Sequence, residues 1–232
     1  MTDKSTSLPH STTKTFRYGA SPESATHAVI LIHGRGGAPP SIVIPFAPTF
    51  LFGPTESKLC ILAPAAENRV WYPARFSSRW TENEPWLNAS VERIEREVQG
   101  LERCGISRER IMIGGFSQGA CVAAKYALTY PAKYWGVFIL SGALPGMFQY
   151  ILGSFQGLEE YKAVDLQGTR VFVGCGDMDP LVRPRMVEWT GGVFEHFGAA
   201  VDKRVYEGLG HSINQDERNV LKAWVSEMIA EE

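Results

Sequence analysis

The chain has 232 residues, of which 44% are apolar and 11% aromatic, and its formal net charge is −2. This size and composition suit a single α/β domain with a large core. Basic and acidic residues are interspersed along the chain, which argues against nucleic acid or an anionic membrane surface as the main partner. The sequence also lacks the window of about 18 apolar residues that a membrane span needs.

The first part of the chain, residues 1–26, is predicted to form an arm and an edge strand ahead of a domain that covers residues 27–232. The segment MTDKSTSLPHSTTKTFRYG is polar and has no apolar core like that of a secretory signal. We expect a frayed arm that leads into a strand near residues 14–18. We also expect a cytoplasmic protein, because the four cysteines form no CxxC pair and suit buried free thiols.

From residue 27 onward, short apolar runs alternate with helical patterns. The apolar runs lie at 27–33, 59–64, 110–115, 135–142, 170–176 and, more weakly, 201–208. Such runs are typical of strands that are covered on both faces. Helical periodicity separates them at 87–101 (with Asn88 as the expected N-cap), 118–130 and 215–230. We therefore predict a mostly parallel, doubly wound sheet with helices on both faces, in one domain.

The first strong strand ends in the glycine-rich loop His33-Gly34-Arg35-Gly36-Gly37. Glycines allow the backbone to turn and to point an N–H group inward, and we assign that donor to Arg35. His33 is interpreted as a side chain that braces the loop. A phosphate-binding role is disfavoured, because the loop has neither the lysine of a P-loop nor the spacing of a dinucleotide-binding motif.

Two long, aromatic-rich connections follow strand ends, at 66–87 and 142–161. Long ordered loops often carry function, and an open parallel sheet binds its ligand at the carboxyl ends of its strands. The side chains expected to wall an apolar substrate pocket are Trp71, Tyr72, Phe76, Trp86, Leu181 and Val182. For Phe76 and Trp86, packing of the loop onto the core is an equally good interpretation.

The segment Gly115-Phe116-Ser117-Gln118-Gly119 reads G-x-S-x-G and lies between an expected strand and an expected helix. In a nucleophile elbow this turn lifts the serine hydroxyl above the sheet. A Cβ at Gly115 or Gly119 would then collide with neighbouring backbone. An ordinary glycine-rich turn would have the same sequence, so the pentapeptide alone does not decide the matter.

A serine nucleophile needs a histidine base, and this architecture places that base after the serine in the chain. Only His196 and His211 follow Ser117. His196 falls inside a helical pattern. His211 lies in a glycine-flanked loop after a strand and before the last helix, so we assign the base to His211.

The histidine in turn needs an orienting acid, and Asp177 and Asp179 both follow the strand at 170–176. One of them is expected to be the acid and the other a brace of the loop. Alternatively, both could cap the helix that starts near Pro184. The oxyanion of a reacting ester would be held by two backbone N–H groups, that of Gln118 after the nucleophile and that of Arg35.

The chain resembles the phospholipase/carboxylesterase family of α/β-hydrolases from about residue 27 to its end. The segments that carry the resemblance are LIHGRGG, LAPAAENRVWYP, NEPWL, RIMIGGFSQGACVAAKYAL, GVFILSGALPG, GCGDMDPLVRP and YEGLGHSIN. The resemblance implies Ser117 as nucleophile, Asp179 as acid and His211 as base, with the N–H groups of Arg35 and Gln118 as oxyanion donors. It implies no cofactor, and no cluster of residues has the spacing of a metal site.

The segments HGRGG and WYP are similar to those of the bacterial esterase branch of the family. The predicted function is therefore that of a carboxylesterase acting on small-molecule esters of short to medium acyl chains. An acyl-protein thioesterase or lysophospholipase is the alternative. A more remote one is a non-catalytic relative that binds a ligand, although such proteins usually lose a member of the triad and none is missing here. The sequence leaves the oligomeric state open.

Overall fold

The computed structural model describes residues 9–53, 55–146, 161 and 164–231. The start of the predicted arm (residues 1–8), most of the second long connection (147–160) and residues 162 and 163 lie outside the described residues. Every strand expected from the apolar runs is present, and the edge strand lies at the predicted position.

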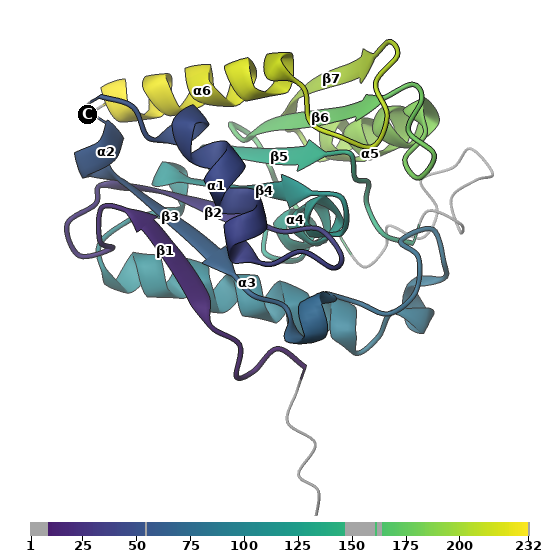
Figure 1. The fold of residues 1–232 in the computed structure, drawn as a ribbon, viewed down its shortest axis with the longest axis horizontal. Helices are drawn as coiled ribbons and strands as arrows, with labels where there is room; N and C mark the ends of the chain where they lie inside the picture. The colour runs from purple at the N-terminus through teal and green to yellow at the C-terminus, as the bar shows by residue number, and fades with distance from the viewer. Residues whose placement is uncertain (1–8, 54, 147–160, 162–163, 232) are drawn as a thin grey trace, which may run out of the picture.

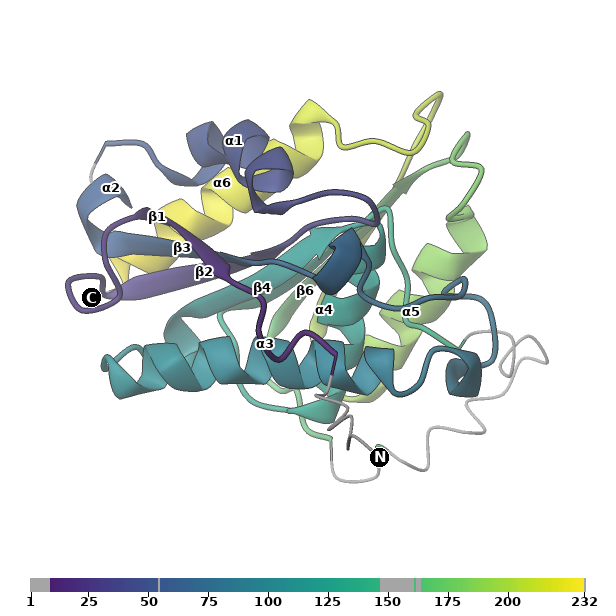
Figure 2. The ribbon, with the colours of Figure 1, turned by 60° about the horizontal axis from the view of Figure 1, so that its bottom comes forward.

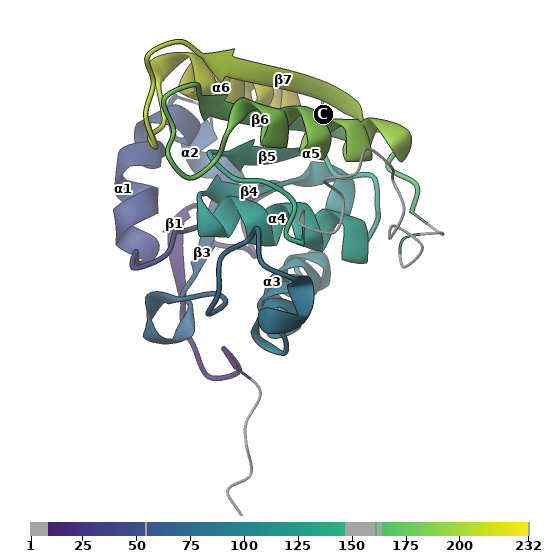
Figure 3. The ribbon, with the colours of Figure 1, turned by 90° about the vertical axis from the view of Figure 1, so that its right-hand side faces the viewer.

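These strands form a seven-stranded sheet in the order β1-β3-β2-β4-β5-β6-β7. All neighbouring pairs are parallel except β1, which runs antiparallel to β3 at the edge. Figure 3 shows β7, β6, β5 and β4 one below the other. The strands are β1 (Thr15–Gly19), β2 (His27–Ile32), β3 (Leu59–Pro64), β4 (Ile111–Phe116), β5 (Gly136–Leu140), β6 (Arg170–Gly176) and β7 (Ala200–Tyr206).

Helices cover both faces of the sheet, as Figures 1 and 2 show. One face carries α1 (Pro39–Phe50), α2 (Thr55–Lys58) and α6 (Gln215–Ala230); the other carries α3 (Trp86–Arg103), α4 (Gln118–Thr129) and α5 (Pro184–His196). Short 3-10 turns lie at Glu67–Arg69, Trp80–Glu82 and Arg108–Arg110. Each face has its own apolar core between sheet and helices. Within the described residues, none of these helices has the length and apolar composition of a membrane span.

Helix α1 was not expected from the sequence, because Pro45 and Pro48 lie inside it. A proline removes a backbone donor and usually breaks a helix. Here the buried side chains Ile42, Phe46 and Phe50 recur at helical spacing and pack against the sheet. Tertiary burial therefore outweighs the poor helix propensity of this segment.

The expectation that Asn88 caps α3 is wrong. The helix begins at Trp86, with Pro85 as its N-cap residue. Asn88 lies inside the first turn, where its backbone N–H donates to the carboxylate of Glu84 at 3.3 Å.

The sheet positions a site at the carboxyl ends of β2 and β4. The chain passes from β2 to β3 on one side of β2, and then crosses to β4 on the other side. At such a switch point the two loops diverge and leave a crevice for a ligand. The loops that leave β2 and β4 are the glycine-rich loop and the serine turn.

Candidate active site

Ser117 occupies a strained turn between β4 and α4. Its φ of 56° and ψ of −120° are unusual for a residue with a side chain. The backbone is held on both sides, since the Ser117 N–H donates to the Leu140 carbonyl at 2.9 Å and its own carbonyl accepts from Cys121 N–H at 3.1 Å. The turn is therefore fixed by β5 and by the first turn of α4.

The predicted need for glycine on either side of Ser117 is confirmed. A Cβ at Gly115 would lie 2.3 Å from the Ile32 carbonyl oxygen, and one at Gly119 would lie 2.2 Å from the same atom. Backbone cannot move aside as a flexible side chain can. Both positions consequently require glycine for the last residue of β2 to approach the serine turn.

His211 and Asp179 meet Ser117 at this turn. Atom Nε2 of His211 is 2.9 Å from the Ser117 hydroxyl oxygen, and Nδ1 is 2.7 Å from a carboxylate oxygen of Asp179. The Asp179 side chain is fully buried, whereas that of His211 is 20% exposed. The ring of Phe116 packs against the imidazole with 4.8 Å between centroids. With the Nδ1–H donated to Asp179, Nε2 is free to accept the serine proton.

The structure separates the two candidate acids. Besides its contact with His211, Asp179 accepts the backbone N–H groups of Leu181 and Val182 through Oδ1, at 2.8 and 2.9 Å. Asp177 accepts the N–H of Gly208 at 2.8 Å and braces the loop that precedes His211. Neither caps α5, whose N-cap residue is Arg183. His196 is the last residue of that helix, away from the serine turn.

Arg35 and Gln118 both border the space in front of Ser117. Gln118 is the first residue of α4, where a helix leaves its N–H groups without internal partners. Within the described part of the chain, the backbone N–H groups of Arg35 and Gln118 donate to no protein acceptor. Both donors are therefore available to an oxygen on a ligand.

The glycine-rich loop is braced as expected by His33. The buried ring accepts the Ala66 N–H at Nε2, at 3.2 Å, and Nδ1 lies 2.8 Å from the Gly34 carbonyl. Burial lowers the pKa of His33, so the ring is held in its neutral form with the proton on Nδ1. This tautomer satisfies both contacts.

The prediction that Trp71 walls the pocket is not met. Its side chain is fully buried, and the indole N–H donates to the His33 carbonyl at 2.8 Å. Trp71 therefore ties the 66–87 connection to the glycine-rich loop. Trp86 begins α3, is 41% exposed and also lies outside the pocket lining.

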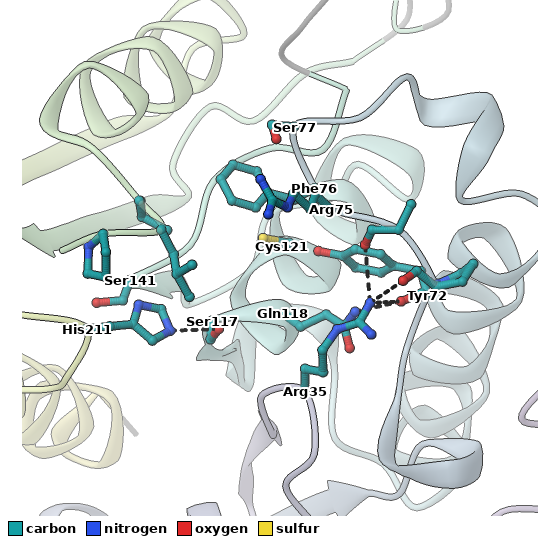
Figure 4. Close-up of a pocket in the computed structure, with 15 residues that line it drawn as sticks. Arg35, Tyr72, Arg75, Phe76, Ser77, Ser117, Gln118, Cys121, Ser141 and His211 are labelled. Atoms are coloured by element: carbon teal, nitrogen blue, oxygen red, sulfur yellow. Dashed lines mark hydrogen bonds between the residues drawn. The ribbon is translucent and has the colours of Figure 1, made fainter.

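A cavity of about 570 Å³ opens in front of Ser117 (Figure 4). The predicted Tyr72, Phe76, Leu181 and Val182 line it. Tyr72 and Val182 are buried in its wall, whereas Leu181 is exposed at the surface. The floor contains Cys121, whose pKa is raised by burial, so this thiol stays protonated and is not a competing nucleophile.

Sequence reasoning missed several residues of this cavity, including Ser141 and Arg75. Ser141 follows β5 with a φ of 45°, and its hydroxyl donates to the Ser212 carbonyl at 3.4 Å, next to His211. A serine after a strand and before a glycine carries no distinctive signal. Arg75 is exposed on the 66–87 connection, in a stretch that contains other arginines.

Among the described residues, no group of His, Cys, Asp and Glu side chains is arranged to hold a metal ion. The groups closest to the Ser117 hydroxyl instead include the His211 imidazole, and the backbone N–H groups of Arg35 and Gln118 border the same space. Such an arrangement is suited to acyl transfer through a serine.

Comparison with known proteins identifies relatives along most of the chain. A family model described as phospholipase/carboxylesterase matches residues 18–229. The chain is similar to acyl-protein thioesterase 1 of Saccharomyces cerevisiae, with 32% identity over 146 residues, or 61% of this chain and 60% of that protein. It is also similar to acyl-protein thioesterase 1 of Eremothecium gossypii, with 27% identity over 218 residues, or 88% of each chain.

Solved structures share the fold. The crystal structure of a phospholipase/carboxylesterase from Dyadobacter fermentans has a TM-score of 0.81 and 30% identity, and the match covers 92% of this chain and 96% of that one. The carboxylesterase of Bacillus cereus has a TM-score of 0.70 at 21% identity, over 94% of this chain and 95% of that one.

The close approach at the serine turn predicts that Gly119→Ala is destabilising. The added methyl group would overlap the Ile32 carbonyl, and overpacking of this kind costs about 1–3 kcal/mol. Gly100→Ala is the control, because that glycine lies within α3 with only a side-chain atom of Arg103 nearby, at 3.8 Å. This second variant should gain up to about 1 kcal/mol. Urea unfolding of both variants measures the difference, and equal stability would contradict the proposed constraint.

Proposed function

The chain belongs to the phospholipase/carboxylesterase family of α/β-hydrolases, and from this premise we propose that it is a serine carboxylesterase. Its substrates would be small-molecule esters of short to medium acyl chains. The observation that carries the proposal is the continuous relay from Asp179 through His211 to Ser117, with contacts of 2.7 and 2.9 Å. A hydrogen-bonded acid, base and hydroxyl in this order are the requirements of nucleophilic catalysis by serine.

In the first half of the proposed reaction, the Ser117 oxygen attacks the ester carbonyl while Nε2 of His211 takes its proton. The carbonyl oxygen becomes an oxyanion, which accepts the backbone N–H groups of Arg35 and Gln118. The C–O bond to the alcohol then breaks. His211 returns its proton to the departing alcohol, and the acyl group stays on Ser117.

In the second half, a water molecule takes the place of the alcohol. His211 removes a proton from the water, whose oxygen attacks the acyl carbon, and the same N–H groups hold the new oxyanion. The bond to Ser117 breaks, the serine regains its proton, and the acid leaves. Asp179 remains ionised throughout and keeps the imidazole in the tautomer that both steps need.

We propose a cytoplasmic location because the cysteines are free thiols. Cys60, Cys121 and Cys175 are buried free thiols, and Cys104 is also free. Thiols persist in this form in a reducing compartment.

Acyl-protein thioesterase activity is the second candidate, because the relatives from Saccharomyces cerevisiae and Eremothecium gossypii carry that name. The two activities differ in leaving group and acyl length. The cavity in front of Ser117 offers apolar surface from Phe76, Leu181 and Val182, and each methylene buried there would contribute about 0.8 kcal/mol until the space is filled.

We expect kcat/KM for aryl esters to rise from acetyl to medium acyl chains and to fall for hexadecanoyl esters. A matched series of thioesters should follow the same profile without exceeding the esters. Hydrolysis rates of both series with the purified protein provide the measurement. A strong preference for hexadecanoyl thioesters would assign the protein to the second candidate.

Ser117→Ala should leave the fold intact and lower ester hydrolysis by roughly 10⁵-fold or more, because no other group supplies the nucleophile. A fluorophosphonate probe should label the wild-type protein at Ser117 and leave the variant unlabelled. Peptide mapping of the labelled protein gives the position. Modification at another residue, or full activity of the variant, would refute the mechanism.

Asp179→Asn and Asp177→Asn should have different effects on catalysis. The first variant presents an amide to His211, favours the wrong tautomer and should lower kcat about 10⁴-fold with little change in KM. The second can still accept the Gly208 N–H through its amide oxygen, so its activity should stay near that of the wild type. Steady-state kinetics of the two variants, with circular dichroism as a check of folding, decide between them. Loss of activity only in Asp177→Asn would move the acid by two residues.

A further inference from the structure

The cavity in front of Ser117 has an unbalanced charge. Arg35 and Arg75 line it, and no Asp or Glu of the described residues does. The chain as a whole has a net charge of −2, so this excess of positive charge is local. A concave site lined by one sign of charge concentrates ligands of the opposite sign.

The two guanidinium groups differ in what they already bind. Nη2 of Arg35 donates to the carbonyl oxygen of Tyr72 at 2.7 Å and also to those of Pro73 and Ala74. The Arg75 guanidinium has no hydrogen bond or ion pair within the described part of the chain. Arg35 therefore fixes the pocket wall, and Arg75 is available to a ligand.

The backbone around Arg75 is held firmly even though its side chain is exposed. The fully buried Asn83 donates its side-chain amide to the Arg75 carbonyl at 3.0 Å and accepts the Ala74 N–H at 2.8 Å. The Arg75 carbonyl also accepts the Ser78 N–H at 3.0 Å. The guanidinium thus extends from a fixed point, which lowers the entropy lost when it binds.

The position of Arg75 indicates which half of an ester it would contact. The alcohol has to leave beside His211, because His211 protonates it. Figure 4 shows Arg75 and Phe76 apart from His211, across the cavity from Ser117. The acyl group would therefore extend toward Arg75, with its methylene groups along Phe76 and Val182.

We propose that the enzyme prefers esters whose acyl chain ends in a carboxylate, that is, monoesters of dicarboxylic acids, and that Arg75 binds this carboxylate. An arginine holds a carboxylate through two parallel N–H···O bonds. The charge of Arg35 adds to the attraction at longer range. The inference rests on the proposed esterase activity and assigns a substrate class to the same site.

A second arginine near the site fits this role less well. Arg218 lines a neighbouring cavity of about 410 Å³ that also borders Arg35 and His211. Its guanidinium donates to the Pro45 carbonyl at 2.7 Å and stacks on Phe46 at 4.7 Å. The Arg218 guanidinium is therefore already bound, and Arg218 does not line the cavity in front of Ser117.

The test compares two aryl esters of equal acyl length, one with a terminal carboxylate and one with a terminal methyl group. A heptanedioyl chain keeps its carboxylate too far from the ester for rapid attack on it. We expect wild-type kcat/KM to favour the carboxylate ester about tenfold, or about 1.4 kcal/mol. Arg75→Gln should remove the preference for the carboxylate ester, and Arg75→Lys should retain part of it. Added salt should reduce the preference in the wild type.

Arg79→Gln is the matched control. Arg79 is exposed on the same connection but does not line the cavity in front of Ser117, so the ratio should stay at the wild-type value. Arg218→Gln should also preserve it. Loss of the ratio in either of these variants but not in Arg75→Gln would overturn the assignment to Arg75.

Two failures can be told apart. If the wild type hydrolyses both esters equally, in a manner that requires Ser117, the charge preference is wrong and the proposed esterase activity stands. If neither ester is hydrolysed and Ser117 is not labelled by a fluorophosphonate, the proposed function and the inference are both wrong.

Discussion

The contact on which the site depends is the approach of the Ile32 carbonyl to the serine turn. Hypothetical Cβ atoms at Gly115 and Gly119 would both lie within 2.3 Å of this one oxygen. Ile32 is the last residue of β2 and directly precedes the glycine-rich loop. The two glycines thus bring the end of β2 against the elbow, so the distance between Ser117 and the N–H of Arg35 is set by packed backbone.

The same constraint reaches the pocket wall through two side chains. Arg35 and Gln118 each present a backbone N–H in front of Ser117, and each also braces the 66–87 connection. Gln118 accepts the Trp71 N–H at 2.9 Å and donates to the Tyr72 carbonyl at 2.8 Å, while Arg35 donates to the same Tyr72 carbonyl. A change in this connection would therefore alter both the shape of the pocket and the position of the candidate oxyanion donors.

The sequence predicted the parts of the molecule that are governed by local patterns. Continuous apolar runs identified the strands, and the glycines around Ser117 identified the turn because backbone approach excludes any larger residue. Prediction from the sequence failed where tertiary contacts determine the local structure. The prolines of α1 concealed a helix that burial stabilises, and an aromatic side chain beside a site, such as Trp71, has the same sequence signal whether it faces the ligand or the core.

The two aspartates show most clearly what the sequence alone does not determine. In an extended segment Asp177 and Asp179 would point the same way. The preference for Asp179 rests partly on its position further into the turn and partly on the resemblance to a family. In the structure the chain turns between them, with the Asp179 N–H donating to the Gly176 carbonyl at 3.3 Å. Such a reversal depends on contacts with the next strand and loop, which residue types alone do not specify.

Asp179 also connects the candidate reaction centre to the wall of the pocket. Its buried carboxylate orients His211 with one oxygen and holds the N–H groups of Leu181 and Val182 with the other. Because three donors fix the carboxylate, the segment after it is anchored at its first residues, while the side chains of Leu181 and Val182 can change without moving the acid. Arg75 is anchored in the same way by Asn83. In the proposed function, substrate selection depends on side chains that extend from a fixed backbone, on loops of a kind that tolerates substitution. The serine turn, by contrast, has no room for a larger residue at Gly115 or Gly119.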